Sequence, residues 1–301
     1  MVYDRIKKFY EENEVNIGGG NLSGVYNASF GLMSEKMADN IKTDKQMRAV
    51  KNFEKFFERI LEAAEEQEVS PMQVEDGKVV LYPGQIDHTC HSYPSMLKGI
   101  ASCGVFASEW FGEREVENEG NMCAFAAKSL PMTGDEKTDA KRVVKPVGKT
   151  ICRLYFDEKN PIVQKLVSYD FFEYQRLKNM YEAGSITKEE FDSKFPDVVR
   201  EFYEAYVEPN SQTSKTFHED EKSGTYSWIA VPGGLPAQLI NGISVNNTNK
   251  TIMENLDKLH EMFPNATIFD QDNNVLKLPI PKNEQKARKK PNDEPDEEPE
   301  F

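Results

Sequence analysis

The stretch YSWIAVPGGLPAQLINGISV (residues 226–245) contains two predicted strands with a sharp break between them. Residues 226–231 and 242–245 are rich in β-branched and aromatic side chains, which favour strands. Pro232-Gly233-Gly234 ends the first strand, because proline and paired glycines interrupt regular structure. A short helix is expected over 237–240, so the two strands are joined by a compact connection.

Around this stretch, short strands and helices follow one another without the regular order of β-α-β units. We predict strands over 79–82, 149–156, 267–269 and 275–278. We predict helices over 93–102, from Pro161 to about 178, from Thr187 with Glu190 three positions later, and over 248–263. This mixture indicates the α+β class.

The two ends of the chain differ in composition from its middle. Apolar residues recur at three- and four-residue steps over 44–66, which predicts a helix packed on the core, and further helices are expected over 3–13 and 30–39. From Pro281 the chain is basic and then acidic, with prolines, and such a composition cannot offset its ordering entropy. We therefore expect an N-terminal helical region (1–75), a main domain (76–280) and a disordered charged tail (281–301).

The composition excludes some partners. The 301-residue chain has 37 Lys and Arg against 51 Asp and Glu, a net charge of −14, which disfavours attraction of the whole molecule to nucleic acid or anionic membrane, although a local basic strip remains compatible with it. No stretch approaches the ~18 consecutive apolar residues that span a bilayer. The four cysteines, Cys90, Cys103, Cys123 and Cys152, form no C-x-x-C pair, so we expect reduced thiols in a cytoplasmic protein with no membrane partner.

Two of the four histidines lie in the tetrapeptide His88-Thr89-Cys90-His91. These residue types bind zinc, but neighbours on an extended chain point to opposite faces and no second ligand pair is close in sequence. We therefore expect no metal site. A nucleophilic pair of Cys90 with His91 or His218 is a further alternative. No phosphate-binding loop of the nucleotide-binding folds is present.

The segments HTCHSYPSMLKGI (88–100), ICRLYFDEKNPIVQKL (151–166) and YSWIAVPGGLPAQLINGISV (226–245) follow one another in an order that resembles the ADP-ribosyltransferase fold. The resemblance is to its prokaryotic branch related to DNA-modifying toxins, and it covers about residues 79–278. It implies a split β-sheet core, NAD as a substrate whose nicotinamide–ribose bond is cleaved, and a macromolecular acceptor of ADP-ribose.

The resemblance also implies roles for single residues. His88 would donate or accept hydrogen bonds at the NAD ribose, with Thr89 beside it and Cys90 at a position where the family often has a small hydroxyl residue. His91 and Tyr93 would line the mouth of the pocket. Phe125, Lys128 and Ser129 follow an acidic run and are the candidates for the family's middle motif. Alternatively, these histidines are half-buried polar residues and Tyr93 a packing aromatic.

The chain departs from the family at the catalytic position. There a glutamate stabilises the positive charge that develops on the ribose as the bond breaks. The aligned residue here is Ser227, which carries no charge. The nearest acids, Glu219, Asp220 and Glu221, lie in the preceding loop, and Glu221 is favoured by nearness; the alternative is a solvated charged loop. A catalytically silent binding module and an acidic interaction protein that mimics nucleic acid therefore stay open as functions.

Overall fold

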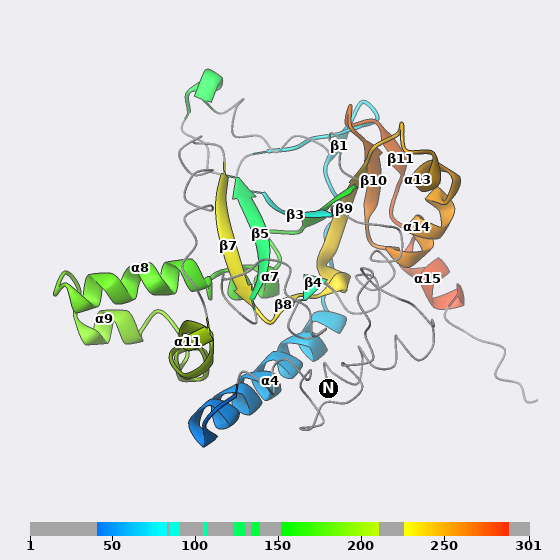
Figure 1. Cartoon of the computed structure of the whole chain (residues 1–301). Coiled ribbons are helices and arrows are strands. Elements are labelled where there is room, and N and C mark those ends of the chain that lie inside the picture. Colours follow the sequence, from blue (N-terminus) through cyan, green and yellow to red (C-terminus); the bar gives the residue numbers. More distant parts are fainter. Residues whose placement is uncertain are drawn as a thin grey trace, which may run out of the picture.

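The computed structural model describes residues 41–82, 85–90, 105–106, 123–129, 134–138, 152–210 and 226–288, and these form a mixed α+β fold (Figure 1). The main sheet has seven strands in the order β11-β10-β9-β6-β3-β5-β7. Its strands are β3 (Ile86–Cys90), β5 (Cys123–Ser129), β6 (Cys152–Phe156), β7 (Tyr226–Pro232), β9 (Ile240–Val245), β10 (Thr267–Asp270) and β11 (Val275–Lys277). Two small sheets pair β1 (Val74–Glu75) with β2 (Lys78–Val79), and β4 (Val105–Phe106) with β8 (Gly234–Leu235).

Helices lie below and beside the sheet in the view of Figure 1. They are α4 (Asp44–Glu65), α7 (Pro161–Val167), α8 (Phe171–Glu182), α9 (Lys188–Asp192), α10 (Asp197–Phe202), the π-helix η2 (Tyr203–Val207), α11 (Glu208–Asn210), the 3-10 helix η3 (Ala237–Leu239), α13 (Lys250–Glu254), α14 (Leu256–Met262) and α15 (Lys282–Arg288). Within the described ranges, none of these helices has the length and apolar content needed to cross a membrane.

Strand β3 pairs very differently with its two neighbours in the main sheet. β3 pairs with β6 along its whole length, from Ile86 opposite Phe156 to Cys90 opposite Cys152. In contrast, β3 pairs with β5 only at Ile86 and Asp87. β5 is itself paired with β7 from end to end. Strand β3 thus stands between a β5–β7 part and a β6–β9–β10–β11 part of the sheet, and its pairing with the first part is limited to two residues.

Helix α4 belongs to the same hydrophobic core as the sheet. A capping box of Thr43 and Gln46 starts the helix, and its apolar face is fully buried at Phe53 and Phe57. The ring of Phe53 stacks on Phe202 with 4.0 Å between centroids. The same core includes Leu154 of β6. Burial of such a helix face is the usual origin of its stability in a protein.

A buried carboxylate joins α8 to β7, the last strand of the sheet order. Asp170 Oδ1 accepts hydrogen bonds from the backbone N–H of Ala230 (2.7 Å) and Phe172 (3.2 Å), and Oδ2 accepts one from Glu173 (3.3 Å). Asp170 therefore caps the helix and holds the strand with one side chain. Burial raises the pKa of Asp170 to about 6 in spite of these three donors.

Most of the predicted elements within the described residues are confirmed. They include α4, β7, η3, β9, β10, β11, the part of 149–156 that is described, and the start of α9, where Thr187 and Glu190 form a capping box. The helices predicted over 3–13, 30–39 and 93–102 lie outside the described residues. The strand predicted over 79–82 was wrong beyond Val79, where β2 ends.

Two long helices were predicted as single elements and are interrupted. The helix from Pro161 ends at Val167, because Asp170 adopts an extended backbone and caps a new helix. The helix over 248–263 breaks at Asn255, whose φ of −112° and ψ of 19° are not helical. α13 and α14 connect the parallel strands β9 and β10, which makes one β-α-β unit that the sequence pattern did not reveal.

The expectation of a disordered tail from Pro281 was wrong for its first turns, which form α15. Gln285 Nε2 donates hydrogen bonds to the carbonyl oxygen of Ile280 (2.6 Å) and to Asn265 Oδ1 (3.1 Å). Lys282 Nζ lies 2.7 Å from Glu68 Oε1. These tertiary contacts stabilise a polar segment whose composition alone disfavours order. The remainder, 289–301, lies outside the described residues.

We expect Gly233→Ala to destabilise the fold strongly, because two penalties act there. Gly233 has a φ of 77°, and a Cβ would lie 2.9 Å from Cδ2 of the buried Phe57 ring. Together these should lower the free energy of unfolding by about 2–4 kcal/mol. Gly184→Ala is the matched control, since Gly184 has a φ of 71° but a Cβ there would meet no atom within 4 Å, and it should cost about 1 kcal/mol. Equal losses in chemical denaturation would contradict the proposed close packing.

Candidate functional site

The structure brings the described members of the predicted site into three strands. His88, Thr89 and Cys90 are on β3, Phe125 and Lys128 on β5, and Ser227 on β7. Lys128 pairs with Ile86 on one side and with Ser227 on the other. Residues from distant parts of the sequence thus occupy neighbouring register positions. His91, Tyr93, Glu219, Asp220 and Glu221 lie outside the described residues.

Both strands of the 226–245 stretch belong to the same sheet as His88. In the strand order, β7 is separated from β3 by β5, and β9 is separated from β3 by β6. The connection between β7 and β9 passes through β8, where Leu235 pairs with Val105 and Gly234 with Phe106. The two strands of the 226–245 stretch therefore lie on opposite sides of β3 in the strand order. Residues 105–106 pair with the connection between these two strands.

His88 lies in β3 directly after the last residue that pairs with β5. It pairs in register with Leu154 of β6, which in turn pairs with Ile243 of β9, and both aliphatic residues are fully buried. His88 itself is half-buried. Beyond Asp87 no strand of the described residues pairs with β3 on the β5 side.

A buried ion pair next to His88 was not predicted from the sequence. Asp87 Oδ1 lies 3.3 Å from Arg153 Nε, and the two side chains are 1% and 19% exposed. Neither carboxylate oxygen of Asp87 accepts a hydrogen bond from the described part of the chain. Burial raises the pKa of Asp87 to about 6, although Arg153 and His88 act in the opposite direction. The signals in the sequence were an acidic residue directly before the histidine motif and a single charged residue in the otherwise apolar strand β6.

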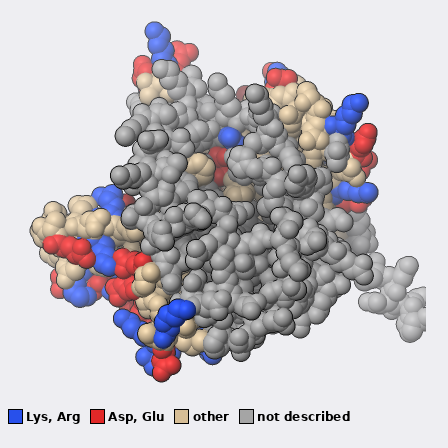
Figure 2. Space-filling view, in the orientation of Figure 1, with Lys and Arg blue, Asp and Glu red and all other residues tan. Residues whose placement is uncertain are grey.

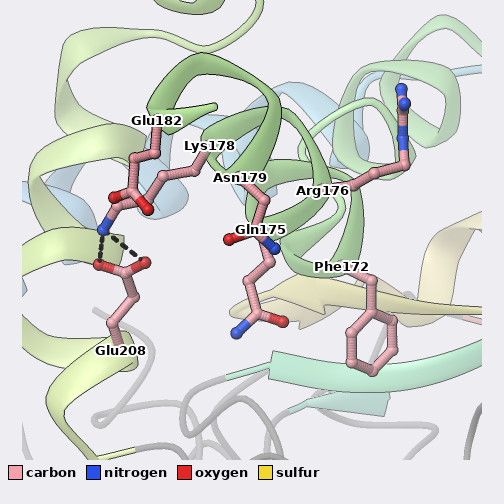
Figure 3. A pocket seen from close by; sticks show the side chains of 7 residues that line it. All are labelled: Phe172, Gln175, Arg176, Lys178, Asn179, Glu182 and Glu208. Atoms are coloured by element: carbon pink, nitrogen blue, oxygen red, sulfur yellow. Dashed lines mark hydrogen bonds and ion pairs between the residues drawn. The ribbon is translucent and has the colours of Figure 1, made fainter. Parts of the chain in front are cut away.

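A separate groove of about 480 Å³ lies along α8 (Figure 3). Lys178 Nζ is held between the two carboxylate oxygens of Glu208, at 2.6 and 2.8 Å, and Gln175 and Asn179 present amide groups beside them. The remaining lining residues are Phe172, Arg176 and Glu182. None of the predicted site residues lines this groove.

Metal binding and known relatives give no further assignment. The described residues contain no group of three or more His, Cys, Asp and Glu placed to hold a metal ion. Cys152, the first residue of β6, is buried. The chain matches no protein family, no curated protein and no solved structure. The geometry of the described residues therefore carries the functional interpretation.

We expect Asp87→Asn to alter the pH dependence of stability. The pKa of Asp87 in the folded protein, about 6, exceeds its ordinary value of 3.8, so folding is favoured by protonation of this group. This contribution is complete below about pH 4 and is lost as the pH rises through about 6, at up to about 1.4 kcal/mol for each pH unit. Between pH 4.5 and pH 7, the free energy of unfolding of the wild-type protein should therefore fall relative to that of the variant, by up to about 1.4 kcal/mol for each pH unit.

Thermal and urea unfolding at both pH values measure this difference. Asp272→Asn is the matched control, because Asp272 is an exposed aspartate outside the core and its replacement should leave the pH profile of the wild type unchanged. An identical pH profile for Asp87→Asn and the wild-type protein would contradict a raised pKa at this position.

Proposed function

We propose that this chain is an NAD-binding protein of ADP-ribosyltransferase-like fold, which cleaves the nicotinamide–ribose bond and transfers ADP-ribose to a macromolecular acceptor. The observation that carries the proposal is the end of the pairing between β3 and β5 beside His88. The pairing of β3 with β5 ends after Asp87, directly before the His88-Thr89-Cys90 segment. The backbone of β3 beyond Asp87 has no strand partner on the β5 side among the described residues, and this supports a ligand site beside His88.

The arrangement of the other segments also supports the proposal. The motifs at 88–100 and 226–245, which are far apart in sequence, have their strands in one sheet with β3 between β7 and β9. The second small sheet, formed by β4 and β8, joins the stretch that follows the histidine motif to the turn after β7. These connections between the two motifs support the proposal.

The chemistry assigns distinct tasks to the proposed residues. The bond between the nicotinamide nitrogen and ribose C1′ breaks with its electron pair leaving on nicotinamide. An acceptor nucleophile then forms a bond to C1′ and loses its proton. His88 would hold a ribose hydroxyl, and a carboxylate near C1′ would stabilise the positive charge that develops there. Glu221 is five residues before the first residue of β7, so the loop can carry it to the end of the strand where Ser227 pairs with Lys128.

Incubation with millimolar NAD tests the enzyme directly. We expect release of nicotinamide, measured by chromatography, and a rise in the melting temperature caused by ligand binding. Glu221→Gln should slow release by about 10²-fold or more, because the charge-stabilising group is lost. Glu189→Gln is its matched control, since Glu189 is exposed on α9. His88→Asn should weaken NAD binding by roughly tenfold through the loss of a hydrogen bond.

The alternative function is a catalytically silent module of the same fold, and the position of Ser227 favours it. Ser227 occupies a regular paired position in β7, where the family's glutamate is expected. In that case NAD raises the melting temperature without being consumed, and Glu221→Gln has no effect. If the protein neither binds nor consumes millimolar NAD, both functions are rejected, and an acidic interaction protein becomes the remaining hypothesis.

A further inference from the structure

Helix α4 has a strip of exposed basic residues in a protein of net charge −14. Lys45, Arg48, Lys51, Lys55 and Arg59 are all exposed and recur every three or four residues, which puts them on one helix face. The strip is about 21 Å long, from the helical rise per residue. We call these five residues the α4 basic strip. Figure 2 shows Lys and Arg side chains over the end of α4 at the bottom of the view.

The strip lacks neutralising partners on its own surface. Among the ion pairs of the described residues, none includes a member of the strip. The exposed charged residues from 45 to 59 are all basic, whereas exposed acidic residues lie at the two ends of the helix, Asp44 before the strip and Glu62 and Glu65 beyond it. Like charges three or four residues apart on a helix repel one another. The strip is therefore suited to an anionic partner.

The order of charges in the last part of the chain complements that of α4. Along α4 a basic block is followed by an acidic block, at 62–68. Towards the C-terminus, a basic block that includes Lys286 and Lys290 is followed by an acidic block with six carboxylates, at 293–300. The ion pair between Lys282 and Glu68 joins the end of the first charge sequence to the region just before the second. In an antiparallel arrangement, each block would lie opposite the block of opposite charge.

The chain is long enough for this arrangement. The 13 residues after Arg288 extend over up to about 43 Å, and α15 is about 10 Å long. Even if α15 points away from α4, the end of the chain reaches back about 30 Å from the Lys282–Glu68 pair. Lys55 lies about 15 Å and Lys51 about 21 Å along the helix axis from Glu65, and residues 66–68 add up to about 10 Å. Even in this arrangement the end of the acidic block can thus reach Lys55 and Arg59, and Lys51 lies at the limit of its reach.

We propose that the acidic segment 293–300 docks on the α4 basic strip of the same molecule. This contact is electrostatic, reversible and sensitive to salt, because exposed charges are screened within about a Debye length. Another polyanion would have to displace the acidic segment before it could bind the α4 basic strip. The proposal does not depend on NAD binding or on the ADP-ribosyltransferase-like activity.

Lysine acetylation of the full chain tests the docking. One protein is unchanged, and the other has all six acids of 293–300 replaced by the corresponding amides. At low salt, we expect Lys51 and Lys55 to react at least about twofold more slowly in the unchanged protein, as measured by mass spectrometry, because docked carboxylates cover them. The difference should vanish at high salt. Lys194 and Lys250 are exposed outside the strip and serve as internal controls, with equal rates in both proteins.

A second measurement uses the unchanged protein alone. A carbodiimide, which joins a carboxylate to an amine with loss of water, should link 293–300 mainly to Lys51 and Lys55. In a further variant that combines Lys51→Glu with Lys55→Glu, acetylation of the strip should no longer depend on the acidic segment. Equal acetylation rates of the two proteins at low salt would overturn the proposal. So would protection that increases with protein concentration, which indicates a second copy, or an oligonucleotide that protects the strip equally in both proteins.

Discussion

The pairing of strand β3 is the constraint on which the rest of the structure depends. Backbone N–H and C=O groups must find partners when they are buried, and β3 finds them along its whole length only in β6. On its other side, pairing with β5 ends after two residues. Backbone pairing is therefore complete between β3 and β6 and limited to two residues between β3 and β5. The motif that begins with His88 starts where the pairing with β5 ends, so one local feature of strand pairing defines the candidate site.

The two buried aspartates illustrate different ways of keeping a carboxylate inside the protein. Asp170 accepts three backbone hydrogen bonds and thereby joins the start of α8 to β7. Asp87 Oδ1 instead lies 3.3 Å from Nε of Arg153, which is on the neighbouring strand β6. Desolvation dominates in both cases and raises the pKa of each to about 6. Asp170 joins a helix to a strand, whereas Asp87 puts a carboxylate within β3 that accepts no hydrogen bond from any described residue.

The connection between β7 and β9 ties the sheet to the N-terminal helix. Gly233 allows the backbone to pass against the ring of Phe57, which leaves no room for a Cβ. Phe57 belongs to the same buried face of α4 as Phe53, which stacks on Phe202. The apolar face of α4 thus stabilises the sheet and its crossover, while its outer face presents the basic strip. One helix contributes both to the core and to the distribution of surface charge.

Local sequence patterns determined the α+β class and most of the individual elements. Periodicity identified α4, because its buried face is a property of the helix itself. Turn residues located β7, η3 and β9, and the pairing of Thr187 with Glu190 marked the start of α9. These features were predictable because the residues responsible lie within a few positions of one another.

Contacts between distant residues determined what the sequence did not reveal. Strand order, the end of β3–β5 pairing at Asp87 and the approach of Arg153 to Asp87 depend on pairing across long separations in the chain. The break between α7 and α8 arises at Asp170, whose carboxylate also holds β7, and α15 forms because Gln285 finds acceptors outside its own helix. The sequence by itself determined elements such as α4, β7 and β9, whose signals lie within a few residues, whereas β3, β5 and α10 were not predicted. Only the tertiary structure decided which of them meet, because hydrogen bonds and burial between distant segments exist only after folding.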